Sequence, residues 1–195
     1  TGPYILAALA AAGADPGQPV TVKDEPETFL RELGRALEEK PDVVVATGAV
    51  SMGRHDFIPA ALGKAGAKTL FHQVAMRPGK PLFAAQFPGG PLFLGLPGNP
   101  VSTVVGLRFF LLPVLRALQG RPPEEPQAWP LAQAVTKPEG MRCFYKARRD
   151  GPSVRVLSGQ ASFQVRPLLA ADCWAVLPEE GGMVGAQSPV DVFPL

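Results

Sequence analysis

The sequence has few cysteines and little net charge, and each shortage excludes a class of protein. Two cysteines, Cys143 and Cys173, in 195 residues are too few for a disulfide framework, so we expect free, buried thiols in a cytoplasmic protein. The formal net charge is only +2, and a surface for nucleic acid is usually strongly basic. We therefore expect no nucleic-acid partner, and any anion must be bound by a few placed groups.

Long uninterrupted apolar stretches are also missing. No stretch of about 18 residues is free of both charge and proline, so we expect no membrane partner. The apolar stretch 3–12 lacks a preceding basic segment, which a signal peptide would have. In contrast, proline is abundant, with 23 residues against a usual share of about 5%. Because 46% of the residues are hydrophobic, these prolines indicate rigid turns around a packed core.

The first part of the chain, residues 1–121, has the pattern of an α/β domain. Helical patterns alternate with strand-like apolar runs, which predicts three layers, α/β/α, around a mostly parallel sheet. Val20 and Val22 alternate with polar residues and predict a short strand, whereas the run 43–45 predicts a strand buried on both faces. The sequence PGGP between the apolar runs 82–87 and 92–96 predicts a hairpin.

The second part of the chain has a different pattern. Residues 121–127, RPPEEPQ, read as a linker. Beyond them the helical period is lost, and short alternating runs are separated by turn residues. We predict a small all-β, barrel-like domain over residues 122–195.

In open α/β sheets, ligands bind outside the carboxyl ends of the strands, so the loops that leave strands are candidate sites. The first such loop contains Asp24, which either caps the helix at Pro26 or serves as a functional carboxylate. The second loop is TGAVSMGRHD, residues 47–56. Its small residues favour close approach of backbone N–H groups to an anion, although an ordinary turn explains them equally well. The candidates in this loop are Thr47, Gly48, Ser51, Gly53 and the exit residue Asp56.

The third loop contains two cations on one turn. Arg77 and Lys80 flank Pro78 and Gly79, which hold the turn. The two side chains form either an anion clamp or a solvated pair. His72, in a predicted strand nearby, is expected to be structural.

The fourth loop, GLPGNPVS, holds two prolines three residues apart. Asn99 suits a helix N-cap and Pro100 suits the first helical position. Free N–H groups at a helix N-terminus bind anions, so we predict donors at Gly98, Val101 and Ser102. Because Pro97 and Pro100 restrict the unfolded chain, the corner is preorganised. As a single motif it fits a strand-to-helix turn equally well.

Taken in order, the four loops resemble the MoeA family of molybdopterin molybdenumtransferases. The family pattern has a D-P loop, SGGVS-x-G-x-x-D, K-P-G-K-P and GLPGNPVS, and here these are DEP, TGAVSMGRHD, MRPGKP and GLPGNPVS. The β part has FYK at 144–146 and QAS at 160–162, similar to the family's F-x-R and Q-G-S. Ala49 replaces a family glycine, and Arg77 and Lys146 each exchange lysine and arginine. Family members carry two further domains before this region, so the chain resembles a carboxy-terminal fragment.

The resemblance implies that molybdate and adenylylated molybdopterin are the substrates and that AMP and molybdenum cofactor are the products. It implies catalytic roles for Asp24, Asp56, Arg77 and Lys80, with Mg²⁺ held by the two aspartates. Lys146 and Ser162 would bind molybdate from the β domain. The implied partners are small-molecule substrates and, in the full-length protein, a second subunit. Two alternatives stay open: a molybdopterin adenylyltransferase, which shares the α/β fold, and a non-catalytic dimerisation or scaffold module.

Overall fold

The computed structural model describes residues 1–48 and 57–195. Its helical segments include a π-helical turn, η1, and a 3₁₀ turn, η2. The helical segments are α1 Gly2–Ala11, α2 Pro26–Glu38, α3 Ile58–Lys64, α4 Pro100–Gly106, η1 Leu107–Leu111, α5 Leu112–Leu118 and η2 Arg166–Leu169. The strands are β1 Val43–Thr47, β2 Lys68–His72, β3 Met76–Arg77, β4 Phe83–Gln86, β5 Leu92–Leu96, β6 Gln127–Pro130, β7 Val135–Thr136, β8 Arg142–Asp150, β9 Ser153–Val156, β10 Cys173–Leu177, β11 Met183–Val184 and β12 Pro189–Pro194.

The first sheet has four described strands in the order β1-β5-β4-β2. Strands β4 and β5 form the predicted hairpin, with Phe83 opposite Gly95. The prediction of a mostly parallel sheet is wrong for these strands. Only β1 and β5 are parallel, because the tight hairpin makes β4 and β5 antiparallel and β2 also runs opposite to β4.

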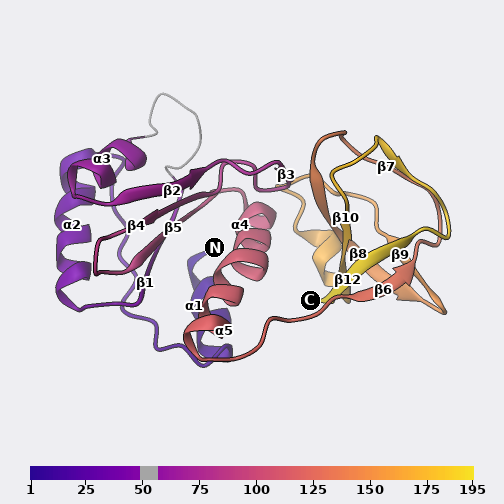
Figure 1. The fold of residues 1–195 in the computed structure, drawn as a ribbon, viewed down its shortest axis with the longest axis horizontal. Coiled ribbons are helices and arrows are strands. Elements are labelled where there is room, and N and C mark those ends of the chain that lie inside the picture. The colour runs from indigo at the N-terminus through magenta and orange to yellow at the C-terminus, as the bar shows by residue number, and fades with distance from the viewer. Residues whose placement is uncertain (49–56) are drawn as a thin grey trace.

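Helices cover both faces of this sheet, as the three-layer prediction requires (Figure 1). Phe83 and Ala85 of β4 pack on one face with Leu33 of α2 and Leu62 of α3. The intervening Ala84 packs on the other face, in the cluster that contains residues of α1, η1 and α5. The alternation along β4 therefore supplies two hydrophobic cores, one on each side.

Two further predictions about this domain are wrong. Residues 14–24 form no strand, and Val20 is 61% exposed. Strand β1 is half-buried along Val43–Ala46, where burial on both faces was expected. Strand β1 is half-buried because it is the last strand in the described sheet and pairs only with β5. An apolar sequence shows that a strand can be buried, but its burial also depends on whether other strands or helices lie beside it.

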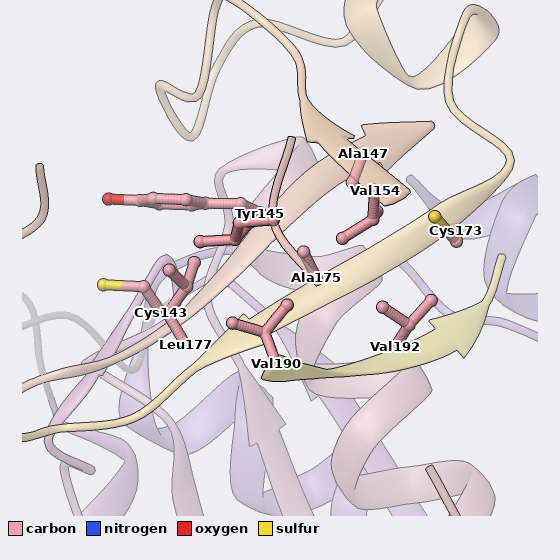
Figure 2. Packing of buried hydrophobic residues seen from close by; sticks show 10 residues of the cluster. Cys143, Tyr145, Ala147, Val154, Cys173, Ala175, Leu177, Val190 and Val192 are labelled. Carbon is pink, nitrogen blue, oxygen red and sulfur yellow. The ribbon is translucent and has the colours of Figure 1, made fainter. Parts of the chain in front are cut away.

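The second part of the chain folds into the predicted barrel-like β domain. Strands follow the order β3-β8-β10-β12-β6, and β9 pairs with β8. A parallel bridge between Leu131 and Val154 joins the β6 side to β9 and closes the ring. Alternate residues point inward, as Figure 2 shows. The buried inner residues are Leu131, Cys143, Tyr145, Ala147, Val154, Cys173, Ala175, Leu177, Val190 and Val192.

The outer face of the barrel packs against the first domain through helix α4. Phe144, Trp174 and Val176 alternate with the inner residues and join one cluster with Val101 and Val105 of α4. Figure 1 shows α4 between the two sheets. Strand β3, from the first half of the chain, pairs in parallel with β8 of the barrel. The two parts are therefore joined by a shared strand as well as by a shared apolar core.

One helical stretch among the described residues, Pro100–Leu118, has the length and apolar composition of a membrane-crossing helix. Its first turns are the buried helix α4 that lies between the two sheets. This is also the composition expected of a core helix, which the packing of α4 requires.

The barrel interior predicts instability at alkaline pH. Both cysteines are free and buried, as the sequence predicted. Burial is the main cause that raises the pKa of Tyr145 from 10.0 to about 12, and it likewise raises the pKa of Cys173 from 9.0 to about 12. Above pH 9 the unfolded chain releases protons that the native state keeps, so stability falls as pH rises. At about 1.4 kcal/mol per pKa unit, the two groups together remove on the order of 6 kcal/mol by pH 12.

Denaturant unfolding at pH 8, 10 and 11 measures this loss. We expect Tyr145→Phe, which keeps the ring and removes the titrating hydroxyl, to reduce the slope of stability against pH above pH 10. An identical slope in the variant and the wild type would show that Tyr145 does not contribute.

Candidate functional site

The proline corner is held by a buried threonine. Asn99 occupies the N-cap position of α4 and Pro100 lies in its first turn, as predicted. The Asn99 side chain makes no capping hydrogen bond. Instead the Thr103 hydroxyl, which is fully buried, donates to the carbonyl oxygens of Pro97 at 2.6 Å and Asn99 at 3.1 Å. Sequence reasoning missed Thr103, although threonine four residues after an N-cap is suited to bond that carbonyl.

We expect Thr103→Val to loosen this corner. Valine keeps the shape but leaves the Pro97 carbonyl oxygen without its hydroxyl donor, which costs about 1–3 kcal/mol for a buried acceptor. The matched control is Thr28→Val, since the Thr28 hydroxyl donates to Glu25 on the surface of α2. Urea unfolding of both variants measures the difference, and equal stabilities would mean that the buried hydroxyl does not order the corner.

The glycine-rich loop begins directly against this corner. The backbone N–H of Gly48 donates to the Leu96 carbonyl oxygen at 3.3 Å. A β-carbon added to Gly98 would lie 3.4 Å from the Gly48 α-carbon, so the two backbones are in close contact. Thr47 and Gly48 are therefore placed beside Pro97 and Gly98. Their loop partners Ser51, Gly53 and Asp56, together with Ala49, lie outside the described residues and remain predictions.

The cationic turn meets the other side of the helix start. The Val74 N–H donates to the Lys80 carbonyl oxygen at 3.0 Å and closes the turn. Pro78 and Gly79 are buried, whereas Arg77 and Lys80 are exposed. A β-carbon added to Gly79 would lie 3.9 Å from the Ser102 carbonyl oxygen. The buried part of the turn thus contacts the first turn of α4 and leaves both cations at the surface.

A loop of the barrel completes the junction and corrects one prediction. The backbone N–H of Val101 donates to the Ser162 carbonyl oxygen at 3.0 Å, so this amide is not free for an anion. The Val101 N–H instead bonds to a loop of the β domain, whose position local sequence patterns could not predict. Of the predicted donors at the start of α4, those of Gly98 and Ser102 remain candidates. The contact brings Ser162 to the corner, as the resemblance implied.

Lys146 orders the loop that carries Ser162. Its side chain is fully buried, and its ammonium donates to the carbonyl oxygens of Gly159 at 2.7 Å and Gln164 at 3.1 Å. Burial lowers the pKa of this ammonium. The Gln160 amide adds bonds to both the N–H and the carbonyl of Lys146. In this structure the Lys146 ammonium holds the loop through these carbonyl oxygens. A direct contact between Lys146 and molybdate remains a prediction.

The described residues do not form a magnesium site. Asp24 is exposed in the turn before α2, and the N-cap of that helix is Glu25, so the capping alternative for Asp24 is wrong. No group of three or more His, Cys, Asp or Glu side chains gathers in the described ranges to hold a metal. Asp56, the second predicted ligand, lies outside those ranges.

Comparison with known proteins gives this junction its context. A family model described as a probable molybdopterin binding domain matches residues 1–117. The model of the MoeA C-terminal region (domain IV) matches residues 128–195. The chain belongs to the MoeA family. Both of its parts are thereby accounted for, the α/β domain and the β barrel alike.

Named relatives agree with this assignment. The chain is 40% identical over 192 residues to a molybdopterin molybdenumtransferase of Synechococcus elongatus, a match that covers 97% of this chain and 47% of the relative. It is 34% identical to the protein of the same name in Haemophilus influenzae, covering 82% of this chain and 41% of that one. The chain thus spans about half the length of the relatives it matches.

Solved structures confirm the fold. A molybdopterin biosynthesis MoeA protein from Pyrococcus horikoshii superposes with a TM-score of 0.78 at 22% identity, over 99% of this chain and 47% of that one. A molybdenum cofactor biosynthesis protein from Pyrococcus furiosus gives 0.74 at 20% identity, over 100% of this chain and 64% of that one. The combination of α/β domain and β barrel is therefore a known fold.

Proposed function

We propose that this chain supplies the molybdate-binding half of a molybdenum insertion site. In the whole protein, molybdenum from molybdate enters adenylylated molybdopterin, and AMP and molybdenum cofactor leave. The observation that carries the proposal is the convergence of two loops and a barrel loop on the proline corner and the start of α4, through the contacts of Gly48, Gly79 and Ser162. The named relatives, which are molybdopterin molybdenumtransferases, support the same reaction.

The chemistry of the junction suits an oxyanion. Molybdate is a tetrahedral dianion, and Arg77 and Lys80 place two exposed cations on one closed turn. Charge-assisted hydrogen bonds to such groups are stronger than neutral ones. The corner adds fixed backbone groups near Gly98 at little entropic cost, because Pro97 and Pro100 hold it in place. Lys146 acts by positioning the Ser162 loop, since its ammonium binds loop carbonyl oxygens.

The setting of the reaction belongs to the same proposal. We place it in the cytoplasm, with small-molecule substrates and with a homodimer as the form of the full-length protein. Substrate-binding roles for Thr47, Gly48, Ser51, Gly53, Asn99 and Ser102, and catalytic roles for Asp24 and Asp56, follow from the resemblance alone.

The test uses the full-length protein with adenylylated molybdopterin and molybdate, and measures AMP and molybdenum cofactor. We expect AMP release to depend on molybdate. The variant Pro97→Ala/Pro100→Ala should lose stability by roughly 1–2 kcal/mol, because each compatible proline contributes about 0.4–1 kcal/mol. Its rate of AMP release should fall further than that loss explains, since the loosened corner must be ordered again on binding.

The matched control is Pro122→Ala/Pro123→Ala in the linker, which should release AMP at the wild-type rate. If the Pro97→Ala/Pro100→Ala variant inserts molybdenum at the wild-type rate, the corner is only a structural turn. Attachment of AMP to molybdopterin, with no molybdate-dependent release, would favour the adenylyltransferase alternative, and absence of both reactions would favour a scaffold module.

A further inference from the structure

An exposed phenylalanine follows Ser162 on the barrel loop that meets the helix start. The side chain of Phe163 is 70% exposed. Among the described residues, it belongs to none of the buried hydrophobic clusters. An aromatic ring contributes to folding mainly by leaving water, so a ring in this position contributes little to the stability of the chain. The Phe163 side chain is therefore available to a ligand.

The loop holds Phe163 in a closed turn. The Gln164 N–H donates to the Ala161 carbonyl oxygen at 3.0 Å, which makes Ser162 and Phe163 the two central residues of a β-turn. The Gln164 side chain accepts a hydrogen bond from the Ala161 N–H at 3.2 Å. The buried Lys146 ammonium donates to the Gln164 carbonyl oxygen at 3.1 Å. The turn that presents Phe163 is thus fixed at both of its ends.

This turn is anchored beside the cationic turn and the proline corner. The Ser162 carbonyl oxygen accepts the N–H of Val101 in the first turn of α4. Leu168, further along the loop, packs in the cluster that contains Val101 and Val105. The backbone of Phe163 therefore lies one residue away from a direct contact with the helix start. A ligand bound there meets a turn that is already ordered, which lowers the entropic cost of binding.

The charges near Phe163 favour a ligand that carries negative groups. Residues 157–171 contain no aspartate or glutamate and one arginine, Arg166. Arg77 and Lys80 are exposed on the turn that packs against the same helix start. A ligand suited to all of these groups has anionic groups and a flat apolar ring in one molecule. Aromatic side chains bind such rings by offset stacking.

We propose that Phe163 stacks on a planar heterocycle of the substrate while the cationic turn binds its anionic groups. This inference rests on the proposed function, whose substrate, adenylylated molybdopterin, carries two such rings, a pterin and an adenine, together with phosphate groups. Both rings offer the same flat π-surface to Phe163, and the experiment distinguishes them. Phe163 is then a specificity-determining residue, because it favours an anion that carries an aromatic ring over a free oxyanion of similar charge.

Calorimetric titration of the full-length protein with the two halves of the substrate, molybdopterin and AMP, tests this contact. We expect Phe163→Ala to weaken binding of one half by roughly tenfold, a loss typical of one base stacked on an aromatic side chain. Phe163→Tyr keeps the ring and should bind both halves as the wild type does. Phe163→Leu keeps an apolar side chain without a ring and should bind as the alanine variant does. All three variants should keep the wild-type affinity for molybdate.

Leu118→Ala is the matched control for removal of an exposed apolar side chain. Leu118 is 57% exposed at the carboxyl end of α5. The helical stretch that begins at Pro100 ends there, roughly 27 Å from the helix start at 1.5 Å per residue. This variant should bind both halves normally. In Phe163→Trp, the half that stacks should quench the fluorescence of the new indole, and the other half should not.

The proposal is overturned if Phe163→Ala or Phe163→Leu binds both halves with wild-type affinity, or if the wild type binds neither. Equal weakening of molybdate binding by Phe163→Ala would also overturn it, because the loop and not the ring would then be responsible. Failure of the proposed function has a different result. Binding that depends on Phe163, without molybdate-dependent release of AMP, keeps the stacking contact and removes the insertion reaction. Molybdate-dependent release with normal binding by Phe163→Ala does the reverse.

Discussion

Gly79→Ala is expected to destabilise the chain by about 2–6 kcal/mol and to displace the cationic turn. Gly79 has a backbone φ of +109°, a conformation that residues with a β-carbon adopt at a cost of about 1–3 kcal/mol. The new β-carbon would also clash with the Met76 ε-carbon. Met76 is 1% exposed and packed with Val101 and Val105, so its side chain has little room to move. Overpacking of this kind costs about 1–3 kcal/mol more.

The matched control for this variant is Gly140→Ala. Gly140 also has positive φ, +70°, but open space surrounds the position of its β-carbon. Its replacement should therefore cost only the backbone term, about 1–2 kcal/mol. Guanidinium unfolding of both variants gives the comparison. Equal losses would show that the turn is not tightly packed against α4, and the geometry proposed for Lys80 would lose its support.

Lys80→Ala is expected to weaken molybdate binding roughly 10- to 150-fold. The loss of one charge-assisted hydrogen bond costs about 1.5–3 kcal/mol. Because Lys80 is exposed and its backbone carbonyl, kept in alanine, closes the turn with Val74, the fold should be unchanged. Calorimetric titration with molybdate measures the dissociation constant, and the melting temperature checks the fold.

Lys64→Ala is the control for the change in charge. Lys64 is an exposed lysine at the end of α3, in a part of the chain to which no binding role is assigned. Its variant should bind molybdate as the wild type does. If both variants bind equally well, the cation pair on the turn is a solvated pair and not an anion clamp.

The local parts of the candidate site were predictable from sequence. The corner and the cationic turn each depend on residues within a few positions of one another, such as Asn99 before Pro100. Proline and glycine restrict the backbone so strongly there that the pattern nearly determines the conformation. The hairpin at PGGP was predicted for the same reason. The same hairpin requires two antiparallel neighbours and therefore argues against a mostly parallel sheet.

The non-local parts were not predictable from local patterns. The Val101 N–H donates to the Ser162 carbonyl oxygen, and β3 joins the barrel sheet. Both contacts depend on how the two domains pack. The ammonium of Lys146 bonds to loop carbonyls that lie 13 and 18 residues away. The strand predicted at Val20 and Val22 does not form.

A crystal of the chain soaked in molybdate, with diffraction measured at the molybdenum absorption edge, tests the central claim most directly. We predict one strong anomalous peak at the helix start, with molybdate oxygens about 3 Å from the Lys80 ammonium or the Arg77 guanidinium and next to the Pro97–Pro100 corner. A peak elsewhere on the surface, or none at concentrations that bind in solution, would contradict the account.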